Sequence, residues 1–78
     1  MAENDKITIR LDKDEALVLF DFLSRFNSEK HKDIFHDQAE EKTLWQIEGQ
    51  LEKILVEPFM PNYQDILIEA RNRLRDKQ

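Results

Sequence analysis

An aspartate followed three residues later by a glutamate stands before two separate apolar runs of this 78-residue chain, and this repeated signal most constrains its fold. Asp12 and Glu15 have the spacing of a capping box, in which two side chains bond backbone amides left unpaired at the start of a helix. Asp37 and Glu40 repeat the spacing, and Asn62 is a capping residue before a third run. The sequence therefore predicts helices over residues 12–27, 38–57 and 62–75.

The apolar residues of each predicted helix recur at spacings of three and four, which gathers them on one face. The apolar arc of the first helix is wider than that of a usual surface helix, so this helix is expected to be central or shared with another molecule. The second helix is expected to cover the first with one face, made of Leu44, Ile47, Leu51, Ile54 and Leu55. We expect one mainly α domain over residues 1–78, with a loop at residues 28–36.

Two prolines, Pro58 and Pro61, end the second helix, because proline lacks an amide hydrogen and restricts the residue before it. Such a short connection predicts that the second and third helices are antiparallel neighbours. Because both helices rise by the same amount per residue, the facing positions follow from the corner. The predicted facing pairs are Gly49 with Ala70 and Trp45 with Leu74. Two small residues in contact allow close approach of the backbones, and the only tryptophan is interpreted as a core residue.

Residues 6–11 alternate strictly between polar and apolar side chains, as no other stretch does. Alternation is typical of a β-strand, because successive side chains face opposite sides. The two sides consist of Ile7, Ile9 and Leu11, and of Lys6, Thr8 and Arg10. A lone strand needs an edge to pair with, which leaves open a second copy of the chain, an element that the sequence does not reveal, or no stable strand. Residues 1–5 are expected to be disordered.

The composition excludes several functional classes. The chain has no cysteine, hence no disulfide, no thiolate metal site and no thiol nucleophile, and it fits a reducing compartment. The start MAENDK lacks a leader pattern and no apolar run is long enough to cross a membrane, so a cytoplasmic location is expected. The formal charge of −5 disfavours a general nucleic-acid binder and favours a basic partner.

No motif in the sequence carries recognisable chemistry. His31 and His36 lie near several acids, but their spacing matches no metal site of defined geometry. A single glycine rules out most loops that hold phosphate groups. The basic residues Arg71, Arg73 and Arg75 complement the dipole at the end of the third helix. We therefore predict a chain that is not an enzyme, without catalytic residues, metal or cofactor.

The preferred function is that of a protein-binding module that docks on a basic protein partner, in an immunity-like or antitoxin-like role. Exposed acids would raise the rate of encounter with a basic surface. The predicted partner-binding residues are Asp33, Asp37, Glu40, Glu41, Glu48 and Glu52.

Two stretches of the chain resemble known proteins. The segment ITIRLDKDEALVLFDFL resembles the start of ribbon-helix-helix proteins, in which strands of two chains pair and read the DNA major groove. This resemblance implies a homodimer sealed by Ile7, Ile9 and Leu11, and an alternative function as a DNA-binding regulator through Lys6, Thr8 and Arg10. The segments EALVLFDFLSRFN and DQAEEKTLWQIEGQLEKILVEPFMPNY resemble a group of short uncharacterised bacterial proteins without assigned activity.

Overall fold

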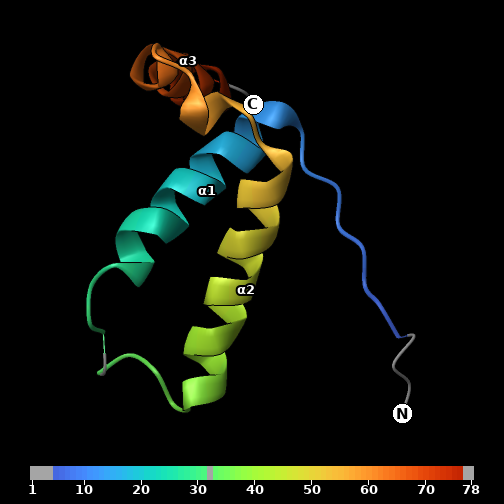
Figure 1. Ribbon diagram of the computed structural model, residues 1–78, viewed down its shortest axis with the longest axis vertical. Helices are drawn as coiled ribbons and strands as arrows, with labels where there is room; N and C mark the ends of the chain where they lie inside the picture. The colour runs from blue at the N-terminus through green and yellow to red at the C-terminus, as the bar shows by residue number, and fades with distance from the viewer. Residues whose placement is uncertain (1–4, 32, 77–78) are drawn as a thin grey trace.

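The structure is a computed structural model that describes residues 5–31 and 33–76. Its elements are α1 (Lys13–Asn27), α2 (Gln38–Ile54), the short 3-10 helix η1 (Glu57–Phe59) and α3 (Tyr63–Arg75). Helices α1 and α2 lie side by side and converge where α1 begins and α2 ends, and α3 crosses that end of the pair (Figure 1). The predicted mainly helical chain with three helices is confirmed.

The capping signals act as the sequence predicts at the start of α1 and, with a shift, at α2. Asp12 Oδ1 accepts a hydrogen bond from the Glu15 backbone amide at 2.8 Å, and Glu15 Oε1 accepts one from the Asp12 amide at 2.9 Å. At α2, Asp37 Oδ1 accepts a hydrogen bond from the Ala39 backbone amide at 2.7 Å. Glu40 bonds the amide of His36 at 2.9 Å, one residue before the expected position. Both helices therefore begin where an acidic side chain replaces the missing backbone acceptor.

Helix α1 is the centre of the fold, as its wide apolar arc predicts. It packs against both α2 and α3, which make little contact with each other. The largest fully buried side chains of the core, Leu17 and Leu67, come from α1 and α3 and are each 1% exposed. The remaining members of the core cluster are Ala16, Phe20, Leu55 and Ala70. Helix α2 contributes no buried residue of its own and covers α1 with half-buried side chains such as Leu51.

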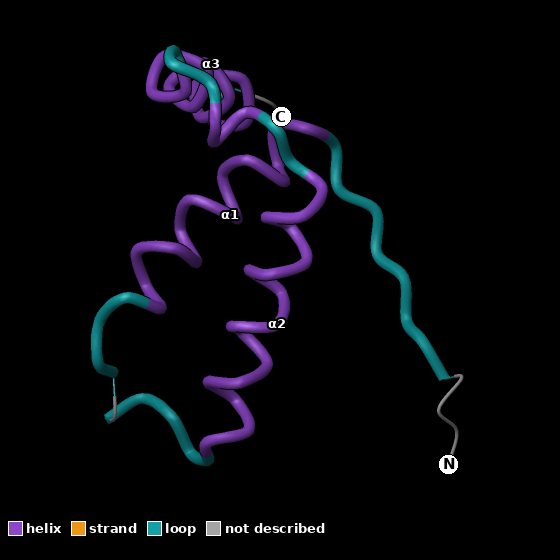
Figure 2. The backbone as a smooth tube through the Cα atoms, viewed as in Figure 1, coloured by secondary structure: helices purple, strands orange, loops and turns teal. Residues whose placement is uncertain are grey.

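The predicted strand over residues 6–11 is absent from the part of the chain that the structure describes. This stretch is an extended loop that runs away from the start of α1 (Figure 2). Ile7 is 92% exposed, Ile9 71% and Leu11 38%. A strand needs a neighbour for its backbone groups, and none of the three helices offers a free edge. Of the segment predicted to be disordered, residues 1–4 lie outside the described residues.

The predicted antiparallel packing of α2 on α3 is wrong. Helix α2 ends at Ile54 rather than at residue 57, and η1 then redirects the chain so that α3 crosses the bundle and packs on α1 (Figure 1). A Cβ atom added to Gly49 would meet nothing within 4 Å, so Gly49 does not face Ala70. Trp45 is 47% exposed and is not a core residue. The wide arc of α1 has room for two neighbours, and α3 buries Leu67 and Ala70 in the core that it forms with α1.

Ion pairs connect α3 to α1. The Arg71 guanidinium lies 2.8 Å from Asp21, and Arg73 binds Asp14 through two nitrogens at 2.8 Å each. Arg73 also lies 3.7 Å from Glu69, one turn earlier in α3. Arg71 and Arg73 are thus engaged with carboxylates of α1 and α3, which supports a structural role for these two arginines.

Replacing Gly49 by alanine is expected to stabilise the protein by about 1 kcal/mol, because glycine is that much less favourable than alanine within a helix. The added methyl group meets no atom within 4 Å, so no steric cost opposes the gain. Urea denaturation of both proteins measures the difference. A destabilising effect would show that another group lies against Gly49.

The ion pair between α1 and η1 predicts a pH dependence. A hydrogen bond from the Lys13 ammonium, 2.7 Å from Glu57, lowers the pKa of Glu57 below its ordinary value of 4.5. A lowered pKa in the folded state stabilises the fold above the unfolded pKa, and this contribution is lost as the pH falls through the folded pKa. Lys13→Met should therefore lower the free energy of unfolding by under about 1 kcal/mol at pH 7.

The difference between the wild type and Lys13→Met should shrink as the pH falls below 4.5, the ordinary pKa of Glu57. Denaturation curves at neutral and acidic pH measure it. A difference that stays constant across this range would contradict the assigned role of the pair.

Candidate functional site

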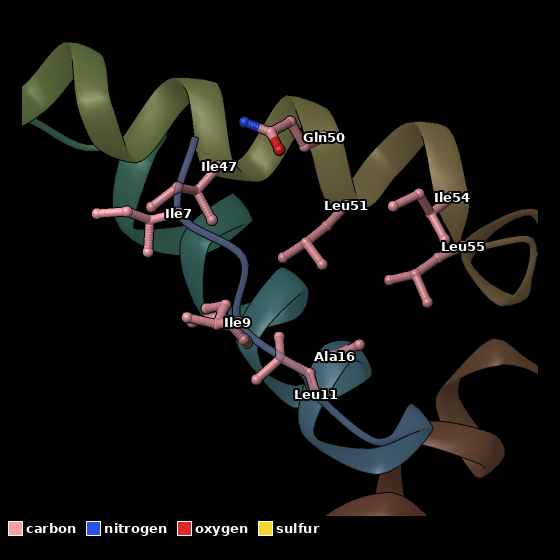
Figure 3. A pocket seen from close by; sticks show the side chains of 10 residues that line it. Ile7, Ile9, Leu11, Ala16, Ile47, Gln50, Leu51, Ile54 and Leu55 are labelled. Atoms are coloured by element: carbon pink, nitrogen blue, oxygen red, sulfur yellow. The ribbon is translucent and has the colours of Figure 1, made fainter. Parts of the chain in front are cut away.

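An apolar groove of about 450 Å³ lies between the N-terminal segment and the helices α1 and α2 (Figure 3). All three apolar residues of the segment form one wall: Ile7, Ile9 and Leu11. The facing wall belongs to α2 and includes Ile47, Leu51 and Ile54. Ala16 and Leu19 of α1 line it as well, and Gln50 is the one polar residue among those that line the groove. The groove is therefore suited to apolar side chains rather than to a charged ligand or to chemistry.

The segment that forms the open wall has unused backbone groups. Residues 6–11 make no hydrogen bond with the rest of the described chain, whereas the next residue, Asp12, is held by the capping box. Extended backbone with free N–H and C=O groups is the template to which another strand can add. The groove thus combines an apolar surface with an open backbone edge.

Apolar exposure continues beyond the groove. Ile54, which lines the groove at the end of α2, is 73% exposed, and outside the groove Val56 and Phe59 in the following turn are 62% and 73% exposed. Monomeric proteins seldom leave large apolar side chains of this kind gathered at one end of the molecule without a partner. This concentration supports the groove as a place of contact.

The six acids predicted to bind a partner do not form one patch. Asp37 and Glu40 are engaged in capping α2. Glu48 faces α1, where it accepts hydrogen bonds from Ser24 at 3.1 Å and from Asn27 at 2.7 Å. The side chains of the other three make no hydrogen bond or ion pair within the described chain: Asp33, Glu41 and Glu52. The structure therefore leaves about half of the predicted acidic set available to a partner.

The residues of the alternative DNA-binding interpretation are available to solvent. Lys6, Thr8 and Arg10 are exposed, and none of them lines the groove. The residues predicted to face Gly49 and Trp45, Ala70 and Leu74, lie in α3, fully buried and half-buried respectively. The structure does not bring either of these residues to the groove.

The two histidines have separate structural surroundings. The His31 ring stacks on Phe26 with centroids 3.9 Å apart, and its Nε2 atom lies 2.9 Å from the Phe26 carbonyl oxygen. His36 stands before α2, where its amide bonds Glu40. Among residues 5–31 and 33–76, no three or more side chains of the metal-binding types lie close enough to hold an ion. In the same residues, no helix is both long and apolar enough to cross a membrane.

The groove is the feature that sequence reasoning missed. The alternation of residues 6–11 was the available signal, but it predicted a strand, with its pairing left open, rather than the wall of a groove. The spacing of Ile47, Leu51 and Ile54 showed an apolar face without showing that part of it stays uncovered.

Comparison of the chain with protein-family models, with curated proteins and with solved structures finds no match. The resemblances to ribbon-helix-helix proteins and to short bacterial proteins therefore stay predictions. The function has to be argued from the groove itself.

Proposed function

We propose that this protein is a non-enzymatic protein-interaction module whose groove accepts an extended polypeptide segment. One observation carries the proposal: residues 6–11 are extended and make no hydrogen bond within the described chain, and their three apolar side chains form one wall of an apolar groove. A strand added beside this segment gains main-chain hydrogen bonds along its edge, and its alternate side chains enter the groove. The partner segment therefore alternates apolar and polar residues.

The charge of the chain favours a basic partner. The formal charge is −5, and the side chains of Asp33, Glu41 and Glu52 have no hydrogen-bonding or ionic partner in the described chain. Opposite charges raise the rate of encounter more than they raise the affinity, so the acids guide the approach and the groove provides the contact. A small acidic protein that binds to the surface of a basic protein, as in an immunity-like or antitoxin-like role, fits these separate roles of the acids and the groove.

Titration of the isotope-labelled protein with a short capped peptide that alternates valine with threonine and lysine tests the proposal by NMR. Binding should shift the amide signals of residues 6–11 and of α2 around Leu51, and leave α3 unchanged. The groove variant Ile54→Lys should lose this binding, whereas the matched variant Ile68→Lys on α3 should keep it. The two isoleucines are 73% and 50% exposed, so both variants are expected to fold.

Two outcomes of this titration would contradict the proposal. One is the absence of shifts up to millimolar peptide. The other is unchanged binding by Ile54→Lys, which would place the contact outside the groove.

The DNA-binding alternative keeps one supporting observation, the joint exposure of Lys6, Thr8 and Arg10. Phosphate contacts supply most non-specific affinity for DNA and make it depend on salt. With a formal charge of −5, the protein is expected to shift no DNA in a gel even at low salt. Salt-sensitive binding that Arg10→Ala weakens would favour the alternative instead.

A further inference from the structure

We infer that one face of α2, separate from the groove, binds arginine side chains of the basic partner. The inference deepens the proposed function and rests on its basic partner, but not on the groove. Glu41, Trp45 and Glu52 stand four and seven residues apart, which places all three on one side of the helix. Ile54, which lines the groove, follows Trp45 by nine residues and so lies on the opposite side of α2. Glu41, Trp45 and Glu52 together form the arginine face.

Trp45 gives the arginine face an aromatic surface that the fold leaves open. Its side chain is 47% exposed. One turn further along α2, Gly49 has no side chain, and a Cβ atom placed there would meet nothing within 4 Å. An incoming side chain therefore has room beside the indole ring.

The two glutamates of the arginine face are not neutralised within the fold. Their side chains make no hydrogen bond or ion pair within the described chain. Lys42 and Lys53 follow them directly, but successive residues of a helix are turned about 100° apart, and neither lysine forms an ion pair with these acids. A cation that reaches Trp45 therefore meets unpaired carboxylates one turn before the indole and two turns after it.

An open cavity at the start of α2 extends the arginine face. Its volume is about 310 Å³, and its lining residues are Phe35, His36, Asp37, Gln38 and Glu41. Glu41 belongs both to this cavity and to the arginine face. The cavity repeats the combination of an aromatic ring with carboxylates, so it suits a second basic side chain of the same partner.

An aromatic ring beside carboxylates favours a guanidinium group over other cations. The guanidinium group is planar, stacks on aromatic rings and binds a carboxylate through two N–H groups at once. The ammonium group of lysine is compact and strongly hydrated, and it lacks this planar geometry. The chemistry of the face therefore calls for arginine rather than for positive charge alone.

Trp45 is the only tryptophan of the chain, so its fluorescence reports on the arginine face alone. The probe is a short capped peptide that alternates arginine with glycine and has no apolar side chain for the groove. This peptide should change the emission of Trp45 at concentrations below about 1 mM. The same peptide with lysine in place of arginine should bind roughly twofold to fivefold more weakly, because it loses the stacking on the indole.

Charge-matched variants separate the arginine face from the overall charge of the chain. Glu41→Gln combined with Glu52→Gln should weaken binding of the arginine peptide by roughly threefold to tenfold, because exposed ion pairs are individually weak. Asp65→Asn combined with Asp76→Asn removes the same charge at the two ends of α3 and should weaken binding by under about twofold. None of the four side chains makes a hydrogen bond or ion pair within the described chain, so both variants are expected to fold.

Three results would overturn the inference: unchanged emission of Trp45 up to millimolar arginine peptide, equal binding of the arginine and lysine peptides, or equal weakening by the two pairs of substitutions. If the peptide of the groove titration still shifts residues 6–11 in those cases, the proposed function stands without the arginine face. If the arginine peptide binds at Trp45 while the groove takes no peptide, the arginine face stands and the groove falls.

Discussion

Replacing Leu67 by alanine should lower the free energy of unfolding by about 2–5 kcal/mol, because the change deletes a buried side chain and leaves a cavity that the core only partly refills. Leu67 is 1% exposed and belongs to the cluster that joins α3 to α1. Small domains are stable by only about 5–15 kcal/mol, so the loss is a large share of the total. The melting temperature should fall by about 10 °C or more.

The adjacent residue of α3 supplies the control. Ile68 is 50% exposed, so Ile68→Ala should change the free energy of unfolding by under about 1 kcal/mol. Thermal and urea denaturation of both variants measure the contrast. Equal effects of the two substitutions would mean that α3 does not present Leu67 to α1.

The replacement of Ala70 by leucine should destabilise the protein by about 1–3 kcal/mol, because a larger side chain in a filled core forces its neighbours out of their preferred positions. Ala70 is 0% exposed and lies in a core cluster whose other members come mainly from α1. A small side chain there lets α3 approach α1 closely.

Ala39→Leu is the matched control for Ala70→Leu, because Ala39 is exposed in the first turn of α2. It should leave the free energy of unfolding within about 0.5 kcal/mol of the wild type. Denaturation midpoints of the two variants give the comparison. Equal midpoints would show that space remains around Ala70 and that the crossing of α3 on α1 is looser than the structure has it.

The helices were predictable because their signals are local. The Asp12 and Glu15 pair fixes the start of α1 through hydrogen bonds within one turn, and the apolar spacing of each helix needs no knowledge of its neighbours. The packing was not predictable in the same way. The short connection after α2 suggested an antiparallel neighbour, but η1 redirects the chain and the wide apolar arc of α1 receives α3 instead.

Small residues and aromatic residues were hard to place for the same reason. Ala70 was expected to face Gly49, whereas it is buried in the core cluster with residues of α1. Trp45 was expected in the core because a small domain seldom exposes its only tryptophan. The core consists of smaller side chains instead, and Trp45 is 47% exposed. Composition and spacing do not say which apolar side chains a third helix will cover.

The candidate site was only half visible in the sequence. Alternation over residues 6–11 marked a segment that needs a partner, but whether the partner lies within the chain depends on the helix arrangement. The three helices offer this segment an apolar surface without a backbone edge, and that combination produces the groove. Three of the acids predicted to bind a partner have structural roles instead: Asp37 and Glu40 cap α2, and Glu48 accepts hydrogen bonds from α1.

Hydrogen exchange of the backbone amides of residues 6–11 tests the central claim most directly, because the claim is that this edge is open in the chain by itself and is filled by another polypeptide segment. In the protein alone these amides should exchange as fast as those of an unfolded chain. With the alternating peptide added at millimolar concentration, alternate amides should become protected, since alternate groups of an edge strand point towards its neighbour. Equal protection with and without the peptide would show that the segment is bonded within a single chain. Absence of protection with the peptide present would contradict the account.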